Sequence, residues 1–123
     1  MPITTLVVFS DPANGDEAFG RVFNALAAAR ELGAAGQPVQ IVFQGAGTRW
    51  PALLRDPQHP AHALFQSVAT RIAGASLGCT AAFDSKAGVE SAGVSLLDDN
   101  AVPGTPGLAS IASFSAAGPV ITF

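Results

Sequence analysis

The chain has 123 residues, of which 49% are hydrophobic and only 12% are charged, and its formal net charge is −3 at pH 7. This composition argues against a nucleic-acid-binding protein, because phosphate contacts require clustered basic side chains and the six Lys and Arg residues are scattered. No apolar run approaches the roughly 18 residues of a membrane span, and residues 2–9 resemble a strand rather than a signal peptide, so no membrane association is expected.

The length is that of one domain, which we place at residues 1–123. The low charge leaves few charged side chains to cover the surface of a small monomer, so we expect a homo-oligomer. Tight packing of the many alanine side chains explains the same composition equally well. One cysteine cannot form an internal disulfide, which is typical of a protein in the reducing cytoplasm.

The first third of the chain predicts a strand, a turn and a helix. Residues 3–9 are a continuous apolar and β-branched run, as in a strand buried on both faces of a parallel sheet. Turn-forming residues occupy positions 10–15, and Asn14 followed by Glu17 resembles a capping box. An apolar stripe with helical spacing follows, made of Phe19, Val22, Phe23 and Leu26, and Gly33 or Gly36 ends it.

The middle of the chain predicts two more strands with helices between them. Residues 39–43 form a second apolar strand, which the turn 44–47 ends, and residues 50–55 form a short helical turn. A helix follows Pro60, with an apolar stripe at Leu64, Phe65, Val68 and Ile72 before Gly74. A short strand over residues 75–79 would place Cys79 at its end, facing the start of another helix.

The last third continues this alternation of strands and helices. Its expected elements are a helix over residues 86–92 capped by Ser85, a strand over 94–97, a loop over 98–107, a helix capped by Thr105 and a strand over 120–123. Such alternation predicts an α/β fold, a three-layer sandwich with a mainly parallel sheet of about five strands and helices on both faces.

Binding sites in such sheets lie beyond the carboxyl ends of the strands, where three loops would gather: residues 10–15, residues 44–49 and the turn at Cys79. The candidate ligand-binding residues in these loops are Asn14, Gly15, Gly45, Gly47, Gly78 and Thr80. Gly78 in particular would let a ligand or a partner's backbone approach closely.

Several known motifs do not match this chain. A Cys-x-x-Cys pair needs a second cysteine, and Ser85 stands where a low-molecular-weight phosphatase loop needs an arginine. Residues 45–49 lack the third glycine of a dinucleotide fingerprint and the Gly-Lys-Ser/Thr of a P-loop. His59 and His62 have no second ligand cluster, so no metal site is expected, and no cofactor either.

Two interpretations of Cys79 remain open on the residues alone. A free cysteine is commonly a small core residue. Alternatively, the N–H groups and dipole of a following helix would favour its thiolate, and a partner histidine brought close by the fold would do the same.

Four segments of the chain resemble the DsrE/DsrF-like family, whose members include subunits of bacterial sulfur-relay complexes. They are VQIVFQGAG at residues 39–47, Leu53 and Leu54, GCTAAF at residues 78–83 with GVESAGV at residues 88–94, and VITF at residues 120–123. The resemblance implies a compact α/β domain assembled as a homotrimer, homohexamer or hetero-hexamer. In the sulfur-transferring members, the cysteine that matches Cys79 carries a persulfide.

We therefore carry forward two hypotheses. In the first, Cys79 accepts a persulfide sulfur from one partner protein and passes it to another. In the second, the protein is a non-catalytic oligomeric module that binds a small ligand or a partner protein with its loops 10–15 and 45–49.

Overall fold

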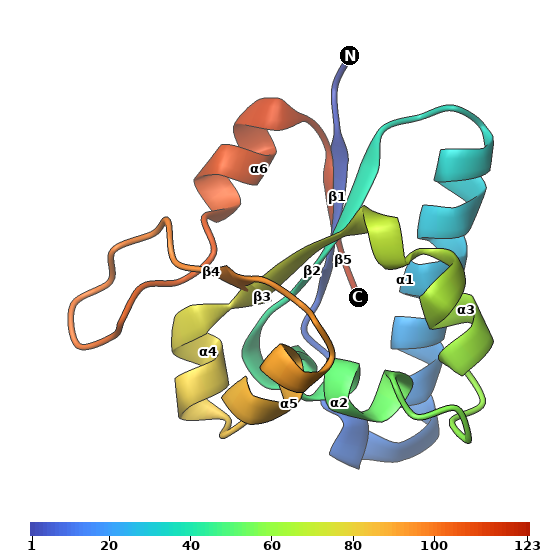
Figure 1. Ribbon diagram of the computed structural model, residues 1–123. Helices are drawn as coiled ribbons and strands as arrows, with labels where there is room; N and C mark the ends of the chain where they lie inside the picture. The colour runs from blue at the N-terminus through green and yellow to red at the C-terminus, as the bar shows by residue number, and fades with distance from the viewer.

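The computed structural model describes all 123 residues and contains one five-stranded sheet, in the order β4-β3-β2-β1-β5 (Figure 1). Every pair of neighbouring strands is parallel. The strands are β1 (Thr4–Val8), β2 (Val39–Phe43), β3 (Ile72–Ser76), β4 (Leu96–Leu97) and β5 (Val120–Thr122). The expected α/β sandwich with a parallel sheet is confirmed.

Six α-helices and three short 3₁₀ helices connect the strands. The α-helices are α1 (Gly15–Ala34), α2 (Trp50–Leu54), α3 (His62–Ser67), α4 (Leu77–Ala82), α5 (Lys86–Ser91) and α6 (Ile111–Ala117). The 3₁₀ helices are η1 (Pro12–Asn14), η2 (Gly45–Arg49) and η3 (Ala69–Arg71). None of the helices has the length and hydropathy needed to cross a membrane.

The two central strands are buried on both faces, as their continuous apolar sequences predict. Leu6 pairs with Ile41 and Val8 pairs with Phe43, and all four side chains are fully buried on one face of the sheet. On the opposite face, the side chain of Gln40 donates a hydrogen bond of 2.9 Å to the hydroxyl of Thr5. Thr5 is fully buried, and this bond gives its hydroxyl a partner.

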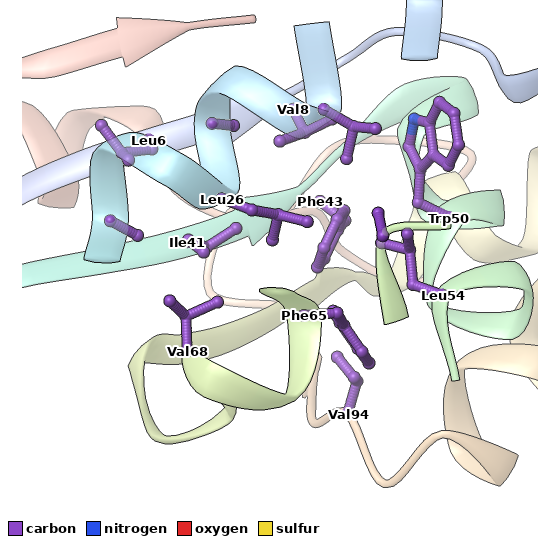
Figure 2. Close-up of a cluster of buried hydrophobic side chains, with 14 of the residues drawn as sticks. Leu6, Val8, Leu26, Ile41, Phe43, Trp50, Leu54, Phe65, Val68 and Val94 are labelled. Carbon is purple, nitrogen blue, oxygen red and sulfur yellow. The ribbon is translucent and has the colours of Figure 1, made fainter. Parts of the chain in front are cut away.

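The main hydrophobic core lies between the sheet and α1 (Figure 2). The helix stripe contributes Val22 and Leu26, which are fully buried, whereas Phe23 at the edge of the stripe is 41% exposed. Trp50 and Leu54 from α2, Phe65 from α3 and Val94 complete the same core. One layer of helices therefore covers this face of the sheet.

The connection from β4 to β5 crosses the opposite face and forms the third layer (Figure 1). Ala109 donates its backbone N–H to the buried hydroxyl of Ser76, at 3.0 Å, and so fastens this connection to β3. At the other end, Ile3 donates its N–H to the carbonyl of Ala117, the last residue of α6. The helix α6 itself buries no residue, so this layer is thin.

The largest departure from expectation concerns the third strand. The strand runs from Ile72 to Ser76 rather than over residues 75–79, and Cys79 is the third residue of α4 rather than a strand end. Gly74 lies inside the strand and does not end a helix. A Cβ at Gly74 would come within 2.7 Å of the Leu97 side chain and the Ser95 carbonyl, so the glycine permits close pairing with β4.

Two of the three expected helix caps lack side-chain hydrogen bonds, and the third cap lies at another residue. Asn14 and Ser85 occupy N-cap positions without a side-chain cap, while Asp11 caps η1 by accepting from the N–H of Ala13. The last helix begins at Ile111 under a Ser110 cap rather than after Thr105. The strand β4 is also shorter than expected. Such boundaries depend on tertiary packing more than on local propensity.

Candidate functional site

The three expected loops do meet at the carboxyl edge of the sheet, where side chains fasten them together. The guanidinium Nη1 of Arg49 lies 3.3 Å from a carboxylate oxygen of Asp11, which joins the second loop to the first. The indole N–H of Trp50 donates to the backbone carbonyl of Ser10 at 2.9 Å. Arg49 Nε also donates to the Phe83 carbonyl, at 3.3 Å, so the segment after Cys79 is joined as well.

Cys79 is a free cysteine at this edge, and the residue is partly exposed. Its backbone carbonyl accepts from the N–H of Phe83 at 2.9 Å, and its Sγ makes no hydrogen bond within the chain. The helix α4 that contains it has six residues, so few aligned peptide dipoles act on the thiol. The structure thus shows Cys79 as a partly exposed residue whose thiol has no hydrogen-bond partner within the chain.

Gly78 is accounted for by packing within the chain. A Cβ at this position would lie 2.5 Å from Leu108 Cδ2 and 3.0 Å from the Gly107 carbonyl, and the Gly78 N–H donates to that same carbonyl at 2.7 Å. The backbone that approaches Gly78 closely is thus the crossing connection of the same protein.

Thr80 and Gly47 are also held by internal contacts. Thr80 is fully buried, and its hydroxyl donates to the Leu77 carbonyl at 2.6 Å. A Cβ at Gly47 would lie 2.1 Å from the Val8 carbonyl oxygen, so the second loop packs directly on the end of β1. These contacts leave neither residue free for a ligand in this conformation.

Unlike Thr80 and Gly47, Asn14 and Gly15 are both exposed, and they lie at the start of α1. Gly15 has φ +71°, and a Cβ at this position would meet no atom within 4 Å, so its backbone conformation, not crowding, favours glycine. Asn14 lines a shallow pocket of about 520 Å³ with Phe9, Asp11, Glu17 and Phe123. Gly45 has φ +56° and does not line this pocket, and a Cβ at Gly45 would lie 3.5 Å from Cδ1 of the Phe9 ring.

One polar group at this edge was not predicted from the sequence. Gln44 follows β2 and is only 6% exposed, and its side-chain Oε1 has no hydrogen-bond partner. Buried amide oxygens are nearly always hydrogen-bonded in native proteins. No sequence signal distinguishes Gln44 from an ordinary strand-end residue, because its burial depends on the segments that pack around it.

A second depression lies between η1, α2 and the start of α5, and we call it the Arg49–Asp84 groove. Its volume is about 560 Å³. It is lined by Asp11, Arg49, Ala52, Leu53, Asp84 and Gly88, among others. Asp84 was not among the candidate residues predicted from the sequence. In the structure it is the one non-glycine residue with a positive φ, at +51°.

The two histidines are committed to local structure. The Nδ1 of His62 lies 2.8 Å from the Leu54 carbonyl, and His59 accepts from the Ala61 N–H at 3.1 Å. The structure brings together no group of three or more His, Cys, Asp or Glu side chains that would hold a metal ion.

Comparison with known proteins adds information on the fold. Neither the family models nor the curated proteins include a match to this chain. The structure is similar to a solved structure of a conserved protein of unknown function from Bacteroides thetaiotaomicron, with a TM-score of 0.58 and 14% sequence identity. That alignment covers 97% of this chain and 94% of the other chain. At this identity, the similarity supports the α/β fold alone.

Proposed function

We propose that this protein is a sulfur-relay protein that accepts and passes on a persulfide sulfur through Cys79. The observation that carries the proposal is a lone, partly exposed thiol at the carboxyl edge of a parallel sheet, the usual location of sites in this architecture. The resemblance of residues 78–83 to the cysteine segment of the DsrE/DsrF-like family supports the same role.

The chemistry needs one thiol in this protein and no cofactor. The Cys79 thiolate attacks the terminal sulfur of a donor persulfide, R–S–SH, forming Cys79–S–SH and releasing the donor thiolate, R–S⁻. An acceptor thiolate, R′–S⁻, then attacks the terminal sulfur of Cys79–S–SH, forming R′–S–SH and restoring the Cys79 thiolate. The transferred sulfur keeps its oxidation state, so no external oxidant or reductant takes part.

The same proposal places the protein in the cytoplasm as a homotrimer or homohexamer. A single free cysteine is typical of a reducing compartment. Several large apolar side chains are exposed on the isolated chain, among them Ile111 at 40% and Ile121 at 45%. Burial of such side chains in a subunit interface would stabilise an oligomer.

Mass spectrometry of the intact protein tests the sulfur-carrier role. After incubation with a low-molecular-weight persulfide donor and removal of excess donor, we expect one added sulfur, about 32 Da, on the wild type and none on Cys79→Ser. A persulfide on the wild type should disappear when an acceptor thiol is added.

A relocated thiol provides the matched control. In the double variant Cys79→Ser/Ser67→Cys, the cysteine lies at the exposed end of helix α3. Sulfur uptake by this variant at the wild-type rate would show ordinary thiol reactivity, and absence of the added mass on the wild type would also reject the proposal.

The second candidate is a non-catalytic oligomeric binding module, and the Arg49–Asp84 groove favours it. This groove is lined by Asp11 and Arg49, which belong to the two loops expected to hold a ligand. In that case Cys79→Ser would leave both ligand binding and oligomer assembly unchanged, and a small thiol reagent would modify Cys79 slowly.

A further inference from the structure

The Arg49–Asp84 groove combines an apolar floor with charged groups on its walls. Gly88 of α5 packs against α2 so closely that a Cβ would lie 2.7 Å from the Cβ of Ala52. Leu53, next to Ala52, lines the groove and leaves 43% of its surface exposed. The helices α2 and α5 lie side by side in Figure 1. Their contact thus forms a shallow apolar surface, of the size that small-molecule sites have.

Arg49 is held in a defined position on one side of this surface. Its Nε donates to the Phe83 carbonyl and its Nη1 to Asp11, each at 3.3 Å, and its guanidinium lies 5.3 Å from the centre of the Phe83 ring. These contacts use two of its three nitrogens. The Nη2 group has no partner in the protein, so a preorganised donor remains for a carboxylate.

Asp84 supplies an unpaired negative charge to the same groove. The ion pairs in the structure are Arg21–Glu17 and Arg49–Asp11, and no side chain or backbone N–H donates to the Asp84 carboxylate. Asp84 lies between α4 and α5, and its backbone there is left-handed, with φ +51°. Of the Arg49 guanidinium nitrogens, Asp11 accepts only from Nη1, so Arg49 Nη2 and the Asp84 carboxylate are the two charged groups of the groove that have no partner.

We propose that this groove binds a small zwitterion with an aliphatic body, that is, an amino carboxylate. The ligand ammonium pairs with Asp84, its carboxylate accepts from Arg49 Nη2, and its body covers Ala52 and Leu53. A ligand with only a carboxylate would be repelled by the negative charge of Asp84. A ligand with only an ammonium would make no hydrogen bond to Arg49 Nη2. The inference is independent of sulfur transfer by Cys79, which does not line the groove.

Titration followed by ¹H–¹⁵N NMR tests this inference with four probes. Leucine and 6-aminohexanoate are isomers that differ in the separation of their two charges, while hexanoate and hexylamine each carry one charge. We expect at least one of the two isomers to shift the amide signals of Asp11, Ala13 and residues 84–88 saturably in the millimolar range. Hexanoate and hexylamine should bind about two- to fivefold more weakly, as expected for loss of one exposed ion pair.

Variants of the protein identify the groups responsible. Asp84→Asn keeps a residue type that tolerates the left-handed backbone and removes the charge, so it should weaken binding of the zwitterion about two- to fivefold. Asp99→Asn, at an exposed aspartate in the loop between β4 and α6 that does not line the groove, and Cys79→Ser should leave binding unchanged. The inference is overturned if neither isomer binds, if a singly charged probe binds as tightly, or if Asp84→Asn binds like the wild type.

Discussion

The hydroxyl groups of Thr48 and Ser85 lie 2.7 Å apart in a buried hydrogen bond between two segments separated by 37 residues. The Thr48 hydroxyl also donates a hydrogen bond of 2.8 Å to the Gly45 carbonyl. The pair therefore connects the turn after β2 to the start of α5, and it helps to hold together the edge of the sheet where Cys79 and the Arg49–Asp84 groove lie.

This pair makes a prediction about stability. Thr48→Val should lower the free energy of unfolding by about 2 kcal/mol, because it leaves both Ser85 and the Gly45 carbonyl without their partner. Ser85→Ala should cost only about 1 kcal/mol, since Thr48 keeps its bond to Gly45. Urea denaturation of both single variants and the double variant measures the coupling. Strictly additive effects would contradict the direct hydrogen bond.

Substitution of Gly78 by alanine tests the close approach of the crossing connection. The new methyl group would overlap Leu108 Cδ2 and press on the Gly107 carbonyl, so we expect a loss of about 1–3 kcal/mol in the free energy of unfolding. Gly20→Ala in α1 is the matched control, because its Cβ would meet no atom within 4 Å. There we expect a gain of about 0.5–1 kcal/mol. Equal effects at both positions would contradict the packing of Gly78.

Replacement of Gln44 by methionine removes the buried oxygen that has no partner. The two side chains have similar length, so we expect the free energy of unfolding to stay unchanged or to rise by up to about 1 kcal/mol. Thermal and urea denaturation measure this. A clear loss of stability would instead show that the Gln44 amide makes a favourable interaction in solution, for example with a bound water.

We expect the proposed oligomer to have a mass in solution that is a multiple of the 12.4 kDa of one chain. Light scattering coupled to size-exclusion chromatography should then show dissociation on Ile111→Lys or Ile121→Lys, because either change places a charge among apolar contacts. Gln58→Lys, at an exposed polar residue, is the control. A monomeric wild-type protein would contradict the prediction.

Much of the candidate site depends on contacts that sequence patterns do not contain. The loops at residues 10–15 and 44–49 could be placed at one edge, because turn residues after parallel strands share that edge. The partner of Ser85, the burial of Gln44 and the groove between Arg49 and Asp84 were not predictable. Each requires knowing which distant segment packs beside it.

The sequence by itself determined the α/β class, the parallel sheet and the two central strands, because hydrophobic periodicity and turn chemistry act over a few neighbouring residues. Only the tertiary structure decided that Cys79 lies within α4 and that the glycine before it accommodates the chain's own connection. The physical reason is that β4 and residues 107–108, which are distant in the sequence, pack against the end of β3 and the start of α4. Their contacts, rather than local propensity, set the end of β3 and with it the position of the thiol.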